Sequence, residues 1–183
     1  MAGEKISVLG FGCMRFPTTS KNAEDIDAEK SAKMLVYAIE NGVNYFDTAY
    51  VYHGGKSESF IGGVLKPYRD KIHIATKCPI WEVKCEEDFD RLLNEQLERL
   101  QTDYIDFYLM HALDKDRFKN VVEKFNLIDK LKKAKADGKI RHIGFSFHDD
   151  VETLKKIIDA SPNCEFCQIQ LNYMNVKYQA GLE

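Results

Sequence analysis

The sequence predicts an α/β protein whose parallel strands and helices alternate to build an incomplete (β/α)8 TIM barrel of about six strand–helix units. Two observations predict this class. Short apolar runs rich in β-branched and aromatic residues alternate with longer segments whose apolar residues recur at helical spacing. These runs are too apolar for strands with one face in water, so we expect a parallel sheet covered by helices.

The expected elements follow one another in strict order. Strands are expected at residues 6–16, 43–47, 71–77, 104–110, 140–146 and 165–171, and Gly10 and Gly12 interrupt the first of them. Helices are expected at residues 28–41, 57–68, 86–100, 118–136 and 151–160. Asp27 is the expected N-cap of the first helix, and Gly42 and Gly138 end the first and fourth helices.

Two architectures agree with this alternation, a doubly wound open sheet and a barrel. A doubly wound dinucleotide-binding sheet needs a glycine-rich turn that leads from a strand directly into a helix. The candidate turn, Gly10-Phe11-Gly12, lacks the third glycine, and about fifteen residues separate it from the next helix. We therefore prefer the barrel, with residues 1–183 forming one partial barrel domain that stops after its sixth strand.

Polar side chains stand at the ends of successive expected strands. Asp47, Lys77, His111 and Ser146 follow one another at intervals of about 30 to 35 residues, and Gln168 lies within the last strand. Taken singly, these residues have ordinary explanations as a turn cap, an exposed loop lysine or a core histidine. In a barrel, however, all these strand ends open on one mouth, where barrel enzymes keep their chemistry.

A proton-transfer site follows from these residues together with Tyr52. A phenol is a poor acid near neutrality, with a usual pKa of about 10. We expect the Lys77 ammonium to favour the phenolate of Tyr52, and the Asp47 carboxylate to keep Lys77 charged and in place. His111 is expected to hold a substrate oxygen against the phenol, as reduction of a carbonyl requires. No side chain supplies hydride, so a nicotinamide cofactor is implied, with Ser146 and Gln168 binding its carboxamide.

The composition narrows the partners. The chain has 183 residues, of which 44% are hydrophobic and 30% charged, and its formal net charge is −3. Basic and acidic residues are interleaved, which argues against nucleic acid as the main partner. Nothing resembles a signal peptide and no apolar run approaches the ~20 residues of a membrane span, so we expect a cytoplasmic protein without a membrane partner. The five cysteines, Cys164 and Cys167 included, are interpreted as reduced structural thiols, and no metal site is expected.

Six motifs, in order along the chain, resemble those of the aldo-keto reductase family. They are GFGCMRFP (10–17), FDTAYVY (46–52) with Ser57-Glu58 after it, IATK (74–77), TDYIDFYLMH (102–111), IGFS (143–146) and QIQLNY (168–173). The resemblance implies that Asp47, Tyr52, Lys77 and His111 form the catalytic tetrad, with Tyr52 as general acid. It implies that Cys13, Met14, Asp47, Ser146 and Gln168 line an NADP(H) site, and that the substrate is a small aldehyde or ketone. The motifs are most similar to a bacterial and archaeal branch whose members often carry an iron–sulfur module after the barrel.

Length sets a further expectation. A full barrel takes typically ~250 residues, and in the family the last two units hold much of the phosphate and adenosine end of the cofactor. We therefore expect the 183-residue chain by itself to bind NADP(H) weakly or to be inactive. An unclosed sheet exposes two edge strands, so self-association through these edges is also expected.

Two other functions stay open at this point. Lys77 at a barrel strand end suits a Schiff-base lyase, in which a neutral lysine attacks a carbonyl. Alternatively, the chain is a non-catalytic module that keeps the fold to bind a cofactor. Two loop residues complete the predictions: Trp81 is interpreted either as a wall of the substrate pocket or as surface packing, and His53 as a flexible loop residue beside Gly54-Gly55.

Overall fold

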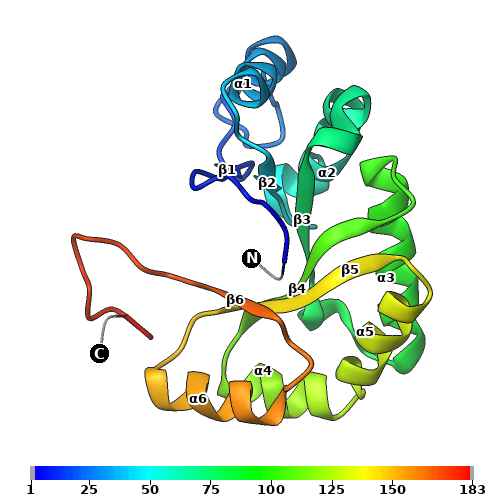
Figure 1. Cartoon of the computed structure of the whole chain (residues 1–183), viewed down its shortest axis with the longest axis vertical. Helices are drawn as coiled ribbons and strands as arrows, with labels where there is room; N and C mark the ends of the chain where they lie inside the picture. The colour runs from blue at the N-terminus through cyan, green and yellow to red at the C-terminus, as the bar shows by residue number, and fades with distance from the viewer. Residues whose placement is uncertain (1–2, 182–183) are drawn as a thin grey trace.

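A computed structural model describes residues 3–181 and contains one curved sheet of six strands. The strands lie in chain order, and each is parallel to its neighbours. Their bounds are Phe11–Gly12 (β1), Tyr45–Asp47 (β2), His73–Cys78 (β3), Ile105–Leu113 (β4), Ile140–Phe147 (β5) and Phe166–Ile169 (β6). The helices cover the convex side of the sheet (Figure 1). The arrangement confirms the predicted incomplete (β/α)8 barrel.

Three of the helices begin and end close to the predicted residues. They are Ala28–Glu40 (α1), Glu86–Leu100 (α3) and Val151–Ala160 (α6). The Asp27 side chain caps α1 by accepting a hydrogen bond of 3.1 Å from the backbone N–H of Lys30, as predicted. The second predicted helix is α2, Ser57–Leu65, continued by a 3-10 segment, Lys66–Lys71 (η2). Two further 3-10 segments, Tyr52–Gly55 (η1) and Ile80–Glu82 (η3), follow β2 and β3.

Two predicted elements are wrong in their extent. The helix predicted for 118–136 is divided into a π-helix at Phe118–Glu123 (η4) and α5, Leu127–Ala136, and a short α-helix, Lys115–Arg117 (α4), comes before it. Asn126 causes the break, because its φ of 49° lies in the left-handed region, which asparagine tolerates better than most residues. Of the strand predicted for 6–16, only Phe11–Gly12 pairs with a neighbouring strand, β2.

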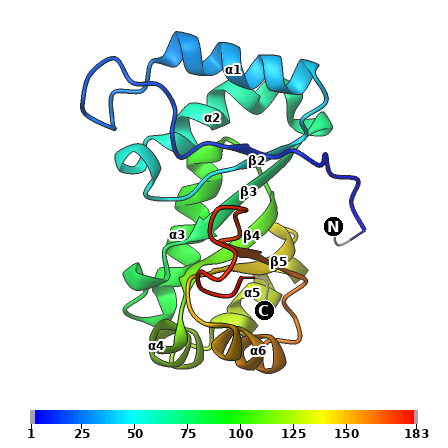
Figure 2. The ribbon, with the colours of Figure 1, turned by 90° about the vertical axis from the view of Figure 1, so that its left-hand side faces the viewer.

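The main core fills the space between the convex face of the sheet and the helices. Its largest fully buried side chains include Phe46, Phe89, Tyr108 and Phe145. A smaller cluster of Ala75, Phe107 and Leu109 lies on the other face of β3 and β4. Figure 2 looks at the concave side, with the residues that follow β6 in front of the strands. Among residues 3–181, no helix is both long and apolar enough to cross a membrane.

Candidate active site

A buried ion pair joins the ends of β2 and β3. The Lys77 ammonium lies 2.8 and 2.7 Å from the two carboxylate oxygens of Asp47, and 2.8 Å from the backbone oxygen of Thr48. Lys77 is only 2% exposed. Because an ammonium has three N–H donors, these three acceptors occupy all of them. Burial raises the pKa of Asp47, and the charge of Lys77 opposes that shift.

Tyr52 begins the 3-10 segment η1, directly beside this pair. Its ring centroid lies 5.2 Å from the Lys77 ammonium nitrogen, and its hydroxyl makes no hydrogen bond within residues 3–181. Burial, followed by the charges of Asp47 and Cys13, raises the pKa of Tyr52 to about 12. Burial dominates this shift, and the expectation that Lys77 favours the phenolate stays a prediction. Tyr52 is a protonated phenol with its hydroxyl free to donate.

His111, near the end of β4, faces Tyr52 edge-on, with 6.2 Å between the two ring centroids. Burial, and then the charges of Lys77, His148 and Arg117, lower its pKa to about 3. The imidazole is therefore neutral at physiological pH, and its buried Nδ1 has no hydrogen-bond partner within residues 3–181. The ring of Trp81 packs against it at 5.1 Å between centroids.

A cavity of about 750 Å³ lies at this end of the strands. Six of the residues predicted for the site line it, namely Met14, Tyr52, Lys77, His111, Ser146 and Gln168. Ser146 and Gln168 are direct neighbours in the register of β5 and β6. The Ser146 hydroxyl oxygen accepts a 2.7 Å hydrogen bond from the backbone N–H of Ala112, which leaves the hydroxyl proton free to donate.

Two predicted site residues lie outside the cavity wall. Asp47 is not among the residues that line the cavity, but its carboxylate interacts with two that do, Lys77 and Gln168. Cys13, which is predicted to line the cofactor site, has a side chain that is fully buried in the core, and burial raises the pKa of its thiol far above the usual range. Its backbone oxygen accepts a hydrogen bond of 3.2 Å from the Ser57 hydroxyl. Cys13 therefore contributes to the structure that holds the site.

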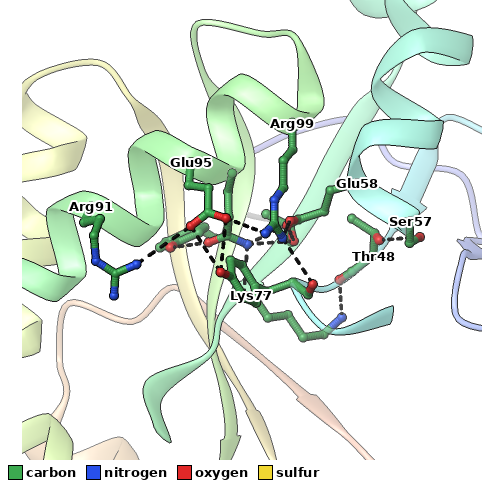
Figure 3. A network of polar contacts seen from close by, with 11 residues as sticks. Thr48, Ser57, Glu58, Lys77, Arg91, Glu95 and Arg99 are labelled. Atoms are coloured by element: carbon green, nitrogen blue, oxygen red, sulfur yellow. Dashed lines mark hydrogen bonds and ion pairs between the residues drawn. The ribbon is translucent and has the colours of Figure 1, made fainter. Parts of the chain in front are cut away.

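A buried polar network contacts the backbone of Lys77 (Figure 3). The Glu58 carboxylate, which is 0% exposed, accepts hydrogen bonds from the Thr76 hydroxyl at 2.6 Å and the Gln96 amide at 2.5 Å. The same amide donates to the backbone oxygen of Lys77 at 3.1 Å. Arg99 pairs with Glu58 at 3.4 Å and connects it to the surface residues Glu95 and Arg91. The network fixes the backbone of β3 on either side of the lysine.

Sequence reasoning did not find this network. Glu58 entered only as part of the Ser57-Glu58 motif, and Gln96 lies within an otherwise regular amphipathic helix. The available signal was Gln96, a polar residue on the apolar face of α3, because a buried side-chain amide requires hydrogen-bond partners. Among residues 3–181, no group of three or more potential ligands is placed to hold a metal ion.

Comparison with known proteins gives one consistent family. Residues 8–182 match the model of the "Aldo/keto reductase family". Among curated proteins, the chain is 33% identical over 153 residues to a probable aldo-keto reductase 1 of Glycine max, covering 79% of this chain and 42% of that protein. It is 32% identical over 151 residues to L-galactose dehydrogenase of Arabidopsis thaliana, covering 79% and 46%. The chain thus spans less than half the length of these two relatives.

Solved structures agree with this result. An aldo-keto reductase from Bacillus halodurans in its holo form superposes with a TM-score of 0.74 and 30% identity, over 90% of this chain and 53% of that one. An aldo-keto reductase from Klebsiella pneumoniae in complex with NADPH gives a TM-score of 0.71 and 25% identity, over 88% and 53%. Both likenesses cover nearly all of the present chain.

Proposed function

Because the chain belongs to the aldo/keto reductase family, we propose that it carries the proton-transfer site of an oxidoreductase that reduces an aldehyde or ketone with NADPH. The observation that supports this most is the convergence of a protonated phenol, a neutral imidazole and a buried ammonium–carboxylate pair on one cavity. Packing alone does not require these groups to meet.

Tyr52 is the general acid in this proposal. Its raised pKa keeps the proton on the phenol until negative charge develops on the carbonyl oxygen of the substrate. The Lys77 ammonium, 5.2 Å from the ring, then stabilises the phenolate that remains after transfer. Neutral His111 positions the substrate oxygen opposite Tyr52. Positioned acid catalysis of this kind contributes roughly 10²–10⁴-fold to a rate.

The residues present fit a nicotinamide. His111 lines the cavity together with Tyr52, and a neutral imidazole can donate or accept a hydrogen bond. Ser146 offers a hydroxyl proton, Gln168 offers both a donor and an acceptor, and Met14 gives the cavity an apolar side chain. When bound, NADPH supplies the hydride that no side chain can provide.

The geometry disfavours the Schiff-base alternative. A lysine nucleophile must be neutral, but Lys77 is surrounded by three oxygen acceptors, two of them from a carboxylate. These contacts stabilise the charged form. The non-catalytic alternative keeps the cavity without the reaction, and the experiment below separates it from the reductase.

The test measures NADPH oxidation by the purified chain with a panel of aldehydes and ketones, at high protein concentration. We expect a slow, carbonyl-dependent rate that falls at least about 100-fold in Tyr52→Phe. Tyr37→Phe, an exposed tyrosine on α1, is the matched control and leaves the rate unchanged. Equal rates of carbonyl-dependent oxidation for Tyr52→Phe and the unaltered chain contradict the proposal.

A further inference from the structure

His53, the residue after Tyr52, is a buried and conformationally strained histidine. It is 7% exposed, and its φ of 54° and ψ of 44° place it in the left-handed region, which is costly for a residue with a side chain. The prediction of a flexible loop residue is therefore wrong. A strained backbone persists only where its surroundings hold it in place, so the contacts of the ring are informative.

Both ring nitrogens of His53 bind the backbone of one loop, which connects β1 to α1. The Nε2 atom accepts a hydrogen bond of 3.1 Å from the backbone N–H of Phe16. The Nδ1 atom lies 2.5 Å from the backbone oxygen of Ala23. A carbonyl oxygen only accepts and an amide N–H only donates, so Nδ1 carries the proton and Nε2 carries none. A single form, the neutral Nδ1–H tautomer, satisfies both partners.

This loop and the turn that carries Tyr52 form adjoining walls of the cavity. The loop contributes Met14, Arg15 and Ala23, and the turn contributes Tyr52 and His53. Their separation in sequence is large, and their packing therefore depends on tertiary contacts. The two hydrogen bonds of His53 connect it to Ala23 and Phe16, which lie 30 and 37 positions earlier in the sequence. His53 directly follows Tyr52, which carries the phenol.

Neighbouring contacts fit the same arrangement. A side chain added at Gly54, whose φ is 62°, would lie closer than any real contact to the side chain of Glu24 from the same loop. Glu24 also pairs with Lys56 at 3.3 Å, on the far side of the turn. The Phe16 ring packs against the imidazole at 5.6 Å between centroids. The loop is therefore closely fitted to the turn around His53.

We propose that His53, as the neutral Nδ1–H tautomer, is a positioning residue that fastens the loop of residues 13–27 to the turn of Tyr52 and so sets the phenol within the cavity. Its effect on the reaction rests on the proposed function of Tyr52. The clamp itself does not, because it consists of hydrogen bonds that can be measured without any substrate.

The experiment measures amide hydrogen exchange of Phe16 in two variants of His53. In each variant, a side-chain amide occupies the position of one of the two imidazole nitrogens. The side-chain amide of asparagine lies where Nδ1 was and asparagine tolerates the left-handed backbone, so His53→Asn loses the acceptor for Phe16. The longer glutamine reaches the position of Nε2, so His53→Gln retains an acceptor. We expect exchange at Phe16 to accelerate at least about fivefold in His53→Asn and to recover toward the original rate in His53→Gln.

One control and one direct measurement of the tautomer accompany this experiment. The amide of Leu35, in the buried core of α1, keeps its exchange rate if each variant is folded. Long-range nitrogen–proton NMR of the unaltered chain reports the tautomer directly, and we expect a proton on Nδ1 of His53. A proton on Nε2, or unchanged exchange of Phe16 in His53→Asn, overturns the clamp.

Turnover then tests the positioning role. Carbonyl reduction should fall at least about fivefold in His53→Asn and recover in part in His53→Gln, in parallel with Phe16 exchange. Faster Phe16 exchange with an unchanged rate of reduction overturns positioning of the phenol. If Tyr52→Phe leaves reduction unaltered while Phe16 exchange follows the prediction, the proposed function fails and the clamp stands.

Discussion

Replacing Asp47 by asparagine removes the negative partner of the buried Lys77 ammonium, and the structure sets the size of the effect. The side chains of Lys77 and Asp47 are 3% and 13% exposed, with 2.7 Å between the ammonium nitrogen and the nearer carboxylate oxygen. Asparagine keeps one oxygen acceptor but no charge, so a buried cation loses its counterion. Breaking a buried pair in this way costs about 3–5 kcal/mol of unfolding free energy.

Urea denaturation followed by circular dichroism measures this loss. The double variant Asp47→Asn with Lys77→Met should recover much of the stability, because an apolar side chain of similar length replaces the unpaired cation. Glu29→Gln is the matched control: its ion pair with Lys33 spans 2.6 Å, but the side chains are 79% and 74% exposed. We expect this control to change stability by less than about 1 kcal/mol. A loss below about 1 kcal/mol in Asp47→Asn would refute the reasoning.

Four further outcomes are expected. Burial lowers the pKa of His111 to about 3 from 6.5, so between these pH values the unfolded chain binds the additional proton and stability falls as the pH drops. Between pH 7 and pH 4.5, the unfolding free energy of His111→Gln should therefore fall by about 2–3 kcal/mol less than that of the unaltered chain. Equal decreases in the two proteins, measured by urea titration, would contradict this. Glu58→Gln should lower the unfolding free energy by about 1–3 kcal/mol, because an amide N–H then faces the Arg99 guanidinium; an unchanged urea midpoint would argue against the network. Ser146→Ala should weaken NADP+ binding in a titration of Trp81 fluorescence, whereas Ser20→Ala, an exposed loop serine, should not. Light scattering should show self-association that grows with concentration, since β1 and β6 leave the sheet open at both edges, and a monomer at all concentrations would exclude it.

Sequence patterns predicted the parts of the fold that depend on periodicity. Strand and helix alternation gives a parallel sheet, and a parallel sheet places all strand ends on one side, so the meeting of Lys77 with Asp47 followed from their spacing. Helix α3 was predicted to the residue because acidic residues open it and its apolar stripe is regular. The break at Asn126 was not predicted, since an isolated left-handed residue leaves the apolar pattern intact.

The electrostatics of the site depended on contacts that spacing does not encode. The backbone oxygen of Thr48 takes the third N–H of Lys77, which is why the lysine has no donor left for Tyr52. His53 looked like an ordinary loop residue because its two partners, Phe16 and Ala23, lie far away in the sequence. Such roles emerge only when the tertiary structure brings distant backbone groups to one side chain.

The most direct test of the central claim is to map NADP+ onto the isotopically labelled chain by NMR, which detects weak binding as well as strong. The claim is that the cofactor's reactive end and the acid share the cavity at the ends of the strands. We predict shifts concentrated at Met14, Ser146 and Gln168 and at the side chains of Tyr52 and His111. Shifts centred elsewhere, or none as NADP+ is raised to high concentration, would contradict it.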